Sequence, residues 1–589
     1  MRRWCSILLC SALFGALLTA PAAVAAGRPR SSAQASRSSS TQSSATNSEA
    51  PIPVPASNAP PAGRRMSANQ VLAIAAALPK MKAVRAKYPG SFGGAYLKLP
   101  FHWQVSFFSR GGKKEIGQVI IDDFSGRVLE QWTGFQVAWT MARGYPGAFG
   151  RHVNALYVWV PLCALFVLPF INFRRPLSLL HLDLLVLLSF SISLAFFNHG
   201  RIYASVPLTY GPLLYLLARM LALSRPRSRP ARPPLRLLVP RFWLALAIVF
   251  LLGFRIALNI VDSNVIDVGY AGVIGAQRLV HGKPLYGSYP SDNEHGDTYG
   301  PVNYEAYVPF QQLFGWSGHW DDLPAAHAAA IFFDLLAVGL IFMLGRRVRG
   351  PTLGIALAYA WVSYPFTLFA LENNANDTLV AVFVLAALLF ASSAPARGAM
   401  AALAGLTKFA PFALVPLLAT HGLWGDPVDG TPRARTAWAR VRQLALFAGA
   451  FVLAGAIAFI PAVTHDTLHT VYERTLAYQG DRGSPFSVWG LYGGLGGAQL
   501  AVQIAAIALA VGLALIPRPR DIVALAAACA AVIIAVQLGM DHWFYLYIPW
   551  FAPLALLALL GSLSLAPEPA PDVASEPARS SRLAVAVSS

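Results

Sequence analysis

Residues 262–322 form a polar, acidic and aromatic-rich stretch between two long apolar runs, Phe242–Val261 and Ala325–Leu344. The stretch contains eight Asp and Glu residues but only two basic ones, Arg278 and Lys283, whereas the whole chain has a formal net charge of +19. Carboxylates at the end of a membrane span cost free energy unless they face water or a polar partner. The stretch is therefore either a solvated loop or a site at the membrane surface, and we favour the site.

Asp267 is the carboxylate of this stretch best placed to act as a general base. It follows the apolar run by a few residues, at the expected boundary between water and membrane. A carboxylate there is partly desolvated, which increases its basicity, while the N-terminal dipole of a short surface helix expected at residues 271–280 favours its charged form. Asp262, at the end of the apolar run, is the alternative base. Asp297 and Glu305 are expected to be solvated.

The composition identifies a polytopic membrane protein. Of the 589 residues, 56% are hydrophobic and 12% charged, whereas soluble proteins have roughly 25% charged residues. Nucleic-acid binding is not indicated, because the arginines cluster in short loops between apolar runs, the positive-inside pattern. No metal site is expected, since His465 and His469 have no third ligand nearby. The four cysteines show no disulfide framework.

Both ends of the chain have the composition of unfolded or processed segments. Arg2 and Arg3 precede an apolar run and a series of small residues, which predicts a secretory signal peptide at 1–26; an uncleaved anchor helix is the alternative. Residues 27–64 and 566–589 are rich in Pro, Ala and Ser, so a disordered linker and a disordered cytoplasmic tail are expected.

Residues 65–135 differ in character and predict a small α+β domain. An amphipathic helix is expected near residues 71–78, followed by strands at His102–Phe108, Gly117–Asp122 and Val128–Trp132. The pattern from Ile121 to Val128 resembles the PepSY type of module. That resemblance implies a regulatory or binding element without catalytic residues.

Eleven apolar runs predict membrane spans, three of them accessory helices within 153–223 and the rest within 242–560. Residues 398–421 are also long enough to span, but both of their flanks are basic, and Lys408 and Pro411 interrupt them. Two half-helices that meet near Pro411 would enter and leave the membrane on the same side, which would place both basic flanks on that side. The alternative is a full span. The expected spans are 153–172, 180–197, 204–223, 242–261, 325–344, 352–371, 376–392, 441–462, 497–516, 521–538 and 542–560.

The arginines between the spans predict the orientation. They fall on one side, the cytoplasm, if residues 65–135 lie outside. Residues 262–322 then lie outside as well, which predicts a multi-pass protein of a bacterial plasma membrane. The residues that carry this argument are Arg174, Arg175, Arg225, Arg227, Arg229, Arg232, Arg236, Arg241, Arg346, Arg347, Arg349, Arg518 and Arg520.

Residues 242–560 resemble the GT-C superfamily of integral-membrane glycosyltransferases, and most closely its polyprenyl-phosphate-mannose-dependent mannosyltransferases. The outer-loop pattern of that family is matched by Asp267, Tyr270, Gly282, Pro284, Tyr286, Tyr299 and Pro301. It departs at Leu285, which separates Pro284 from Tyr286, and at Gly300, where the family has proline. Later matches are Asn376-Asp377, Gly405–Pro411, Ser484–Trp489 and His542–Tyr545.

The resemblance implies an all-α polytopic fold of about eleven spans plus a re-entrant helical hairpin, with the small α+β domain outside. It implies transfer of mannose, or another hexose or pentose, from a polyprenyl-phosphate donor to an extracytoplasmic glycan or glycolipid. The lipid-linked sugar is then a co-substrate, and no other cofactor is expected. The leaving phosphate needs a cation, for which Lys408, Arg474 and Arg482 are the candidates. The aromatic residues of the set are expected to contact the sugar. The expected binding residues are Tyr270, Tyr286, Tyr299, Lys408, Arg474, Arg482, Trp489, His542 and Tyr545.

Two other classes of function stay open. A transporter would place ionisable residues at mid-membrane and show internal repeats; only Lys408, Asp183 and Asp334 approach mid-membrane, and no convincing repeat is found. A scaffold or sensor built on the 65–135 domain explains the accessory spans but not the acidic outer stretch. For most of the aromatics, an ordinary place in the interfacial belt is the competing interpretation.

Overall fold

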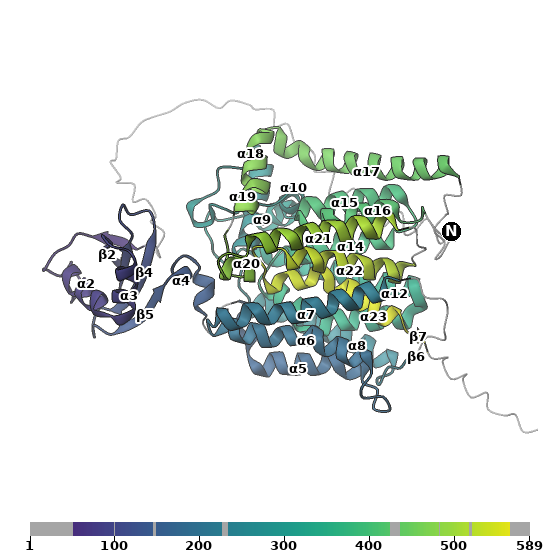
Figure 1. Cartoon of the computed structure of the whole chain (residues 1–589), viewed down its shortest axis with the longest axis horizontal. Coiled ribbons are helices and arrows are strands. Elements are labelled where there is room, and N and C mark those ends of the chain that lie inside the picture. Colours follow the sequence, from purple (N-terminus) through teal and green to yellow (C-terminus); the bar gives the residue numbers. More distant parts are fainter. Residues whose placement is uncertain are drawn as a thin grey trace, which may run out of the picture.

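The computed structural model describes residues 51–98, 100–144, 149–225, 234–423, 436–481, 483–516 and 521–565. The described chain is mostly helical, and a small α+β domain lies at one end of a large helical bundle (Figure 1). The predicted signal peptide, the predicted tail 566–589 and most of the predicted linker 27–64 lie outside the described residues.

The small domain is an antiparallel sheet in the order β1-β2-β3-β4-β5 with two helices packed on it. The three predicted strands are confirmed as β3, β4 and β5, whereas β1, β2 and α3 were not predicted. Because β1 lies within the predicted linker, the domain begins before residue 65. The elements are β1 (Ile52–Val54), α2 (Ala68–Ala77), α3 (Pro79–Lys87), β2 (Phe92–Lys98), β3 (His102–Phe108), β4 (Glu115–Asp122) and β5 (Val128–Thr133).

Six helices of the described chain are long and apolar enough to cross a membrane: α6, α7, α8, α12, α17 and α21. The count of eleven spans stays a prediction. The bundle contains α5 (Leu156–Val167), α6 (Leu179–Asn198), α7 (Ile202–Leu223), α8 (Arg241–Asp262), α12 (Pro324–Ser363), α13 (Pro365–Glu372), α14 (Asp377–Leu389), α15 (Ala394–Thr407), α16 (Val415–Thr420), α17 (Ala437–Val463), α21 (Gly496–Leu515), α22 (Ile522–Leu538) and α23 (Ile548–Gly561).

The shorter apolar helices lie inside the bundle. Nearly every residue of α22 and every residue of α23 is buried. Such helices contact protein on all sides, so the length that a lipid-facing span needs does not apply to them. Two of the predicted spans, 325–344 and 352–371, are joined: α12 contains the first and most of the second, and α13 contains the rest. A kink at Gly350, whose φ is 80°, separates the two parts of α12, and Pro351 follows it.

Residues 394–420 form a helical hairpin. Helix α15 ends at Thr407, and after a short 3-10 helix, Ala410–Leu414, the chain returns as α16. Arg397, near the start of α15, donates from Nε to the Leu418 carbonyl (3.1 Å) and from Nη2 to the His421 carbonyl (3.0 Å), so both ends of the hairpin meet. This geometry agrees with two half-helices; the membrane side on which they begin and end stays a prediction.

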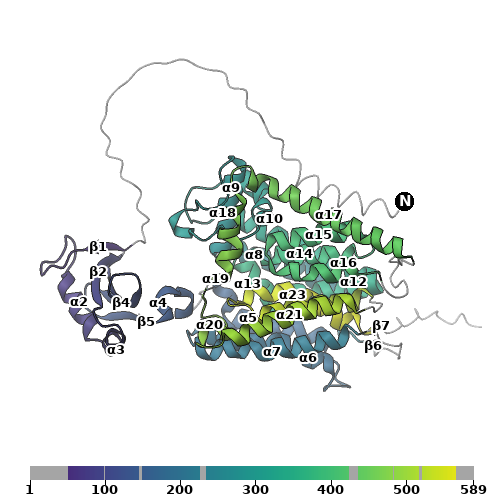
Figure 2. The same cartoon turned by 45° about the horizontal axis from the view of Figure 1, so that its top comes forward.

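The acidic stretch lies at the same end of the bundle as the small domain (Figures 1 and 2). Its helices are α9 (Asp267–Val280), α10 (Pro301–Glu305) and α11 (Val308–Phe314). The short helices α18 (Leu468–Tyr472), α19 (Tyr478–Asp481) and α20 (Val488–Leu491) lie at this end too. The opposite end carries a two-stranded parallel sheet, β6 (Pro234–Leu235) with β7 (Ser564–Leu565).

The predicted orientation can be tested by cysteine labelling of intact cells. Ser288 is an exposed residue of the acidic stretch, and Ser228 belongs to the arginine-rich segment before α8, in a part of it that lies outside the described residues. A membrane-impermeant thiol reagent is expected to label Ser288→Cys and not Ser228→Cys, because the arginine-rich segment is predicted to lie in the cytoplasm. The unsubstituted protein controls for its own cysteines, and labelling of Ser228→Cys alone would reverse the orientation.

Candidate functional site

Helix α9 is held tightly against α10 and α11. Residues 268–276 are buried, and a Cβ at Gly272 would lie 2.7 Å from the Tyr307 ring while one at Gly275 would lie 2.3 Å from the Tyr304 ring. The absence of side chains at these two positions thus lets both rings pack onto the helix. The predicted surface helix at 271–280 was wrong in two respects: it starts earlier, at Asp267, and protein encloses most of it.

The two candidate bases have different surroundings. Asp267 is the first residue of α9, where its side chain is exposed, and its carboxylate interacts electrostatically with that of Asp377. Asp262 instead accepts hydrogen bonds from the His152 backbone N–H (3.1 Å) and from the His152 ring. Asp262 is therefore engaged in holding the segment before α5, which favours Asp267 as the base.

A buried ion pair lies near Asp267. Lys408 Nζ is 2.6 Å from Asp377 Oδ1, and Trp550 Nε1 donates to the same oxygen at 2.8 Å. The ammonium group also lies over three aromatic rings, 5.3 Å from the centroids of Tyr299 and Tyr547 and 5.4 Å from that of Trp550. We call the following residues the outer polar cluster: Asp267, Tyr299, Asn303, Asn376, Asp377, Lys408, Tyr547 and Trp550.

Gly300 explains how the acidic stretch reaches Lys408. A Cβ at this position would lie 2.0 Å from the Leu406 carbonyl oxygen, so the loop backbone rests directly on the end of α15. The close approach places Tyr299 beside the tip of the hairpin. Proline, like any residue with a Cβ, would not fit here.

Several polar atoms of the outer polar cluster are buried without a hydrogen-bond partner among the described residues. They are Asp377 Oδ2, Asn376 Oδ1 and Asn303 Nδ2. The amide of Asn376 donates to Asn303 Oδ1, so the two asparagines hold each other in place. A buried polar atom without a partner costs about 1–3 kcal/mol.

Two other expected binding residues make internal contacts. Tyr270 is buried, stacks on Trp320 and donates to Asp292 Oδ2 (3.3 Å). Tyr286 is buried and donates to the Tyr299 carbonyl (3.1 Å), which supports Tyr299 from behind. Both tyrosines therefore support the fold of the acidic stretch, and of the three outer-loop tyrosines only Tyr299 belongs to the outer polar cluster.

Arg474 makes a two-pronged ion pair with Asp297, through Nε at 2.8 Å and Nη2 at 2.7 Å. The hydrogen bonds to Asp297 raise the pKa of Arg474. Asp297 is fully buried and also accepts from the Gly287 N–H (2.6 Å), so the expectation that it is solvated was wrong. Arg474 thus fastens residues 473–477 to the acidic stretch, and its charge is compensated there.

The remaining predicted residues are spread over the bundle. Tyr545 is buried with its hydroxyl 2.6 Å from Ser193 Oγ and 2.8 Å from Ser205 Oγ, so it packs against α6 and α7. Trp489 Nε1 donates to the Leu538 carbonyl (2.8 Å), and His542 Nδ1 is 2.8 Å from Ser484 Oγ. Arg482 lies outside the described residues.

Glu305 has an unexpected environment. This residue ends α10, and its side chain is largely enclosed by protein. Its Oε1 is buried without a hydrogen-bond partner in the described chain. Burial raises the pKa of Glu305 from 4.5 to about 8. The expectation from the sequence that Glu305 is solvated was wrong, because nothing in the local pattern shows that neighbouring helices cover α10.

Glu305 is expected to make stability depend on pH. Since its pKa is higher in the folded state, the protonated carboxyl stabilises the fold fully below about pH 4.5, and this contribution is lost as the pH rises to about 8. Glu305→Gln is neutral throughout. In thermal unfolding, the stability of the variant relative to the wild type should therefore increase as the pH rises across this window. A difference that does not change with pH would contradict the raised pKa.

No group of three or more His, Cys, Asp or Glu residues that could hold a metal ion is found in the described part of the chain. Comparison with known proteins gives no further assignment of the site: no protein-family model, no curated protein and no solved structure matches this chain.

Proposed function

We propose that the chain is a membrane glycosyltransferase that moves a sugar from a polyprenyl-phosphate donor to an extracytoplasmic glycan or glycolipid. The observation that carries the proposal is the outer polar cluster, where an exposed carboxylate, Asp267, lies near a buried Lys408–Asp377 pair. The resemblance to the GT-C pattern supports it, because three separate motifs contribute to one cluster: the outer-loop pattern with Asp267 and Tyr299, the pair Asn376-Asp377, and the segment that contains Lys408.

In the proposed reaction, Asp267 takes the proton from the acceptor hydroxyl. The hydroxyl oxygen then forms a bond to the anomeric carbon of the donor sugar, and the bond from that carbon to the phosphate oxygen breaks. Polyprenyl phosphate leaves with the electron pair. A positioned base contributes about 10²–10⁴-fold to such a step, and the negative charge that develops on the phosphate needs a nearby cation.

Lys408 is the proposed cation, and Asp377 is its positioning partner. The ring faces of Tyr299, Tyr547 and Trp550 surround Nζ, and aromatic faces are also surfaces on which sugars pack. The unpartnered amide and carboxylate oxygens of Asn376 and Asp377 are proposed acceptors for sugar hydroxyls. Arg474, whose ion pair with Asp297 fastens it to the acidic stretch, is the other candidate cation.

The transporter alternative is less well supported. It needs ionisable groups within the bundle that can bind cargo. Asp334 accepts from Arg255 Nη2 (2.6 Å) and Asp183 accepts from Arg219 Nε (3.0 Å), so both carboxylates are taken up by an arginine of a neighbouring helix. These pairs hold helices together.

The test is a transfer assay with the full chain in membranes. Radiolabelled polyprenyl-phosphate mannose, glucose and arabinose are supplied in turn together with extracts of envelope glycans and glycolipids. The wild type is expected to move label from one donor to an acceptor. A folded preparation that binds none of the donors and moves label from none of them would contradict the proposal.

A further inference from the structure

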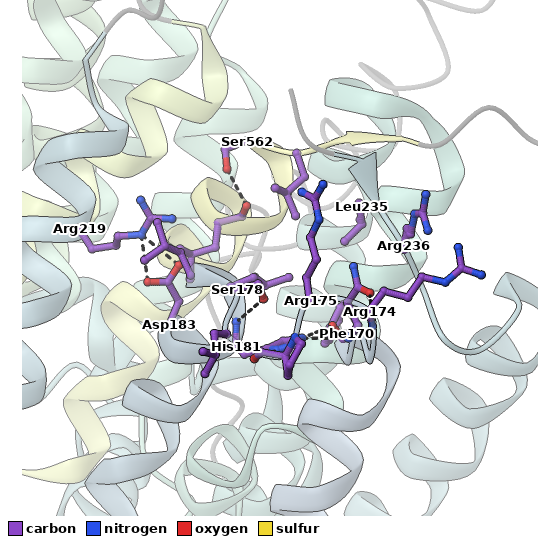
Figure 3. A pocket seen from close by; sticks show the side chains of 17 residues that line it. Phe170, Arg174, Arg175, Ser178, His181, Asp183, Arg219, Leu235, Arg236 and Ser562 are labelled. Carbon is purple, nitrogen blue, oxygen red and sulfur yellow. Dashed lines mark hydrogen bonds and ion pairs between the residues drawn. The ribbon is translucent and has the colours of Figure 1, made fainter. Parts of the chain in front are cut away.

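A second site lies at the opposite end of the bundle from the outer polar cluster. The ends of α6, α7 and α23, together with the segments before α6 and before α8, enclose a cavity of about 930 Å³ (Figure 3). None of the residues proposed for sugar transfer lines this cavity. It therefore needs an explanation of its own.

The cavity is held open by specific contacts. The pairing of Leu235 with Leu565 joins the segment before α8 to the end of α23. His181 holds the segment before α6: its Nε2 lies 2.9 Å from the Asn172 backbone N–H, and its Nδ1 lies 2.7 Å from the Pro176 carbonyl. These contacts fix three parts of the chain around one space, so the wall is built by the fold.

The charge of the cavity is strongly positive. Asp183 is the one carboxylate among its lining residues, and it is fully used by Arg219 Nε (3.0 Å to each oxygen) and by the Tyr215 hydroxyl (2.8 Å). Three further arginines line the cavity, and their side chains are exposed: Arg174, Arg175 and Arg236. Figure 3 shows Arg175 extending between the Arg219–Asp183 pair and Arg236. Among the described residues, these three arginines have no ion-pair partner, so the described lining has a net positive charge.

The rest of the lining is apolar. Phe170, Leu559 and Leu563 form part of the wall, and Leu177 at the rim is 99% exposed. Arginines beside an apolar wall match an amphiphile with an anionic headgroup better than a small hydrophilic anion. Basic pockets between membrane helices on the cytoplasmic side have this chemistry.

We infer that this cavity binds the phosphate headgroup of an anionic phospholipid of the cytoplasmic leaflet, with Arg174, Arg175 and Arg236 as its contacts. The inference goes beyond sugar transfer and does not depend on it, because no residue is shared between the two sites. It depends on the predicted orientation, which the labelling of Ser288 and Ser228 tests separately.

The test is native mass spectrometry of the detergent-solubilised full chain titrated with phosphatidylglycerol or with phosphatidylcholine. The wild type should bind phosphatidylglycerol more tightly. Arg174→Gln/Arg175→Gln/Arg236→Gln should lose about fivefold in affinity for each arginine, or roughly 100-fold in total. The matched control, Arg346→Gln/Arg349→Gln/Arg442→Gln, removes the same charge elsewhere on the predicted cytoplasmic face and should keep wild-type affinity.

Three outcomes would overturn the inference. The cavity variant, shown to be folded by its thermal unfolding, could bind phosphatidylglycerol as the wild type does. The control variant could lose as much affinity, which would show a general effect of surface charge. Inorganic phosphate could displace the lipid from the wild type at concentrations similar to that of the lipid, which would make the site one for a free anion.

Discussion

Replacing Asp267 by asparagine is expected to lower the turnover of sugar transfer by about 10²–10⁴-fold while donor binding is kept. Asparagine has nearly the size of aspartate but cannot accept the proton of the acceptor hydroxyl. Asp267 is the first residue of α9 and its side chain is exposed, so the substitution should leave the packed core intact. Turnover and donor affinity are measured on the same membrane preparation, because a folding defect would lower both.

Asp262→Asn is the matched control for that experiment. It removes a carboxylate five residues earlier, and it is expected to weaken the contact with His152 but to keep most of the turnover. If Asp262→Asn abolished transfer and Asp267→Asn did not, the base would be Asp262. If neither variant changed turnover in a folded preparation that binds donor, the acidic stretch would have no catalytic role.

Elements with a regular pattern could be predicted from the sequence. Strand β3 alternates apolar and polar residues, β4 contains the apolar run Val119–Ile121, and the long apolar helices are continuous runs. Strand β2 was missed because Gly93 and Gly94 remove the alternation, and β1 because only three residues pair. Such strands depend on their neighbours in the sheet, and a local pattern does not contain that information.

The partners of the candidate site residues could not be predicted. The sequence predicts Arg474 on the outer side and Lys408 near mid-membrane. It does not show that Asp297 meets Arg474 across 177 residues or that Asp377 meets Lys408 across 31. The same holds for Tyr545, which reaches serines of α6 and α7 more than 300 residues away because the accessory helices pack on α23. One signal was available for Asp377: an acidic residue at the start of an otherwise apolar helix is costly unless it is paired.

Replacing Lys408 by methionine is expected to destabilise the protein by about 3–5 kcal/mol, because it leaves the buried Asp377 carboxylate without its cation. Trp550 alone would still donate to that carboxylate. The measurement is the free energy of unfolding in detergent. Lys283→Met, at an exposed lysine of the acidic stretch, is the matched control and should change stability by no more than about 0.5 kcal/mol.

The double variant Lys408→Met/Asp377→Asn separates structure from chemistry. The double variant has no buried carboxylate without a cation, because Asp377 is replaced as well. Its stability should therefore return toward that of the wild type. If Lys408 also stabilises the leaving phosphate, the double variant should fold and still lack transfer activity. A double variant that folds and transfers sugar at the wild-type rate would reduce the pair to a structural role. A Lys408→Met protein as stable as the wild type would show that Asp377 is not held as a buried anion.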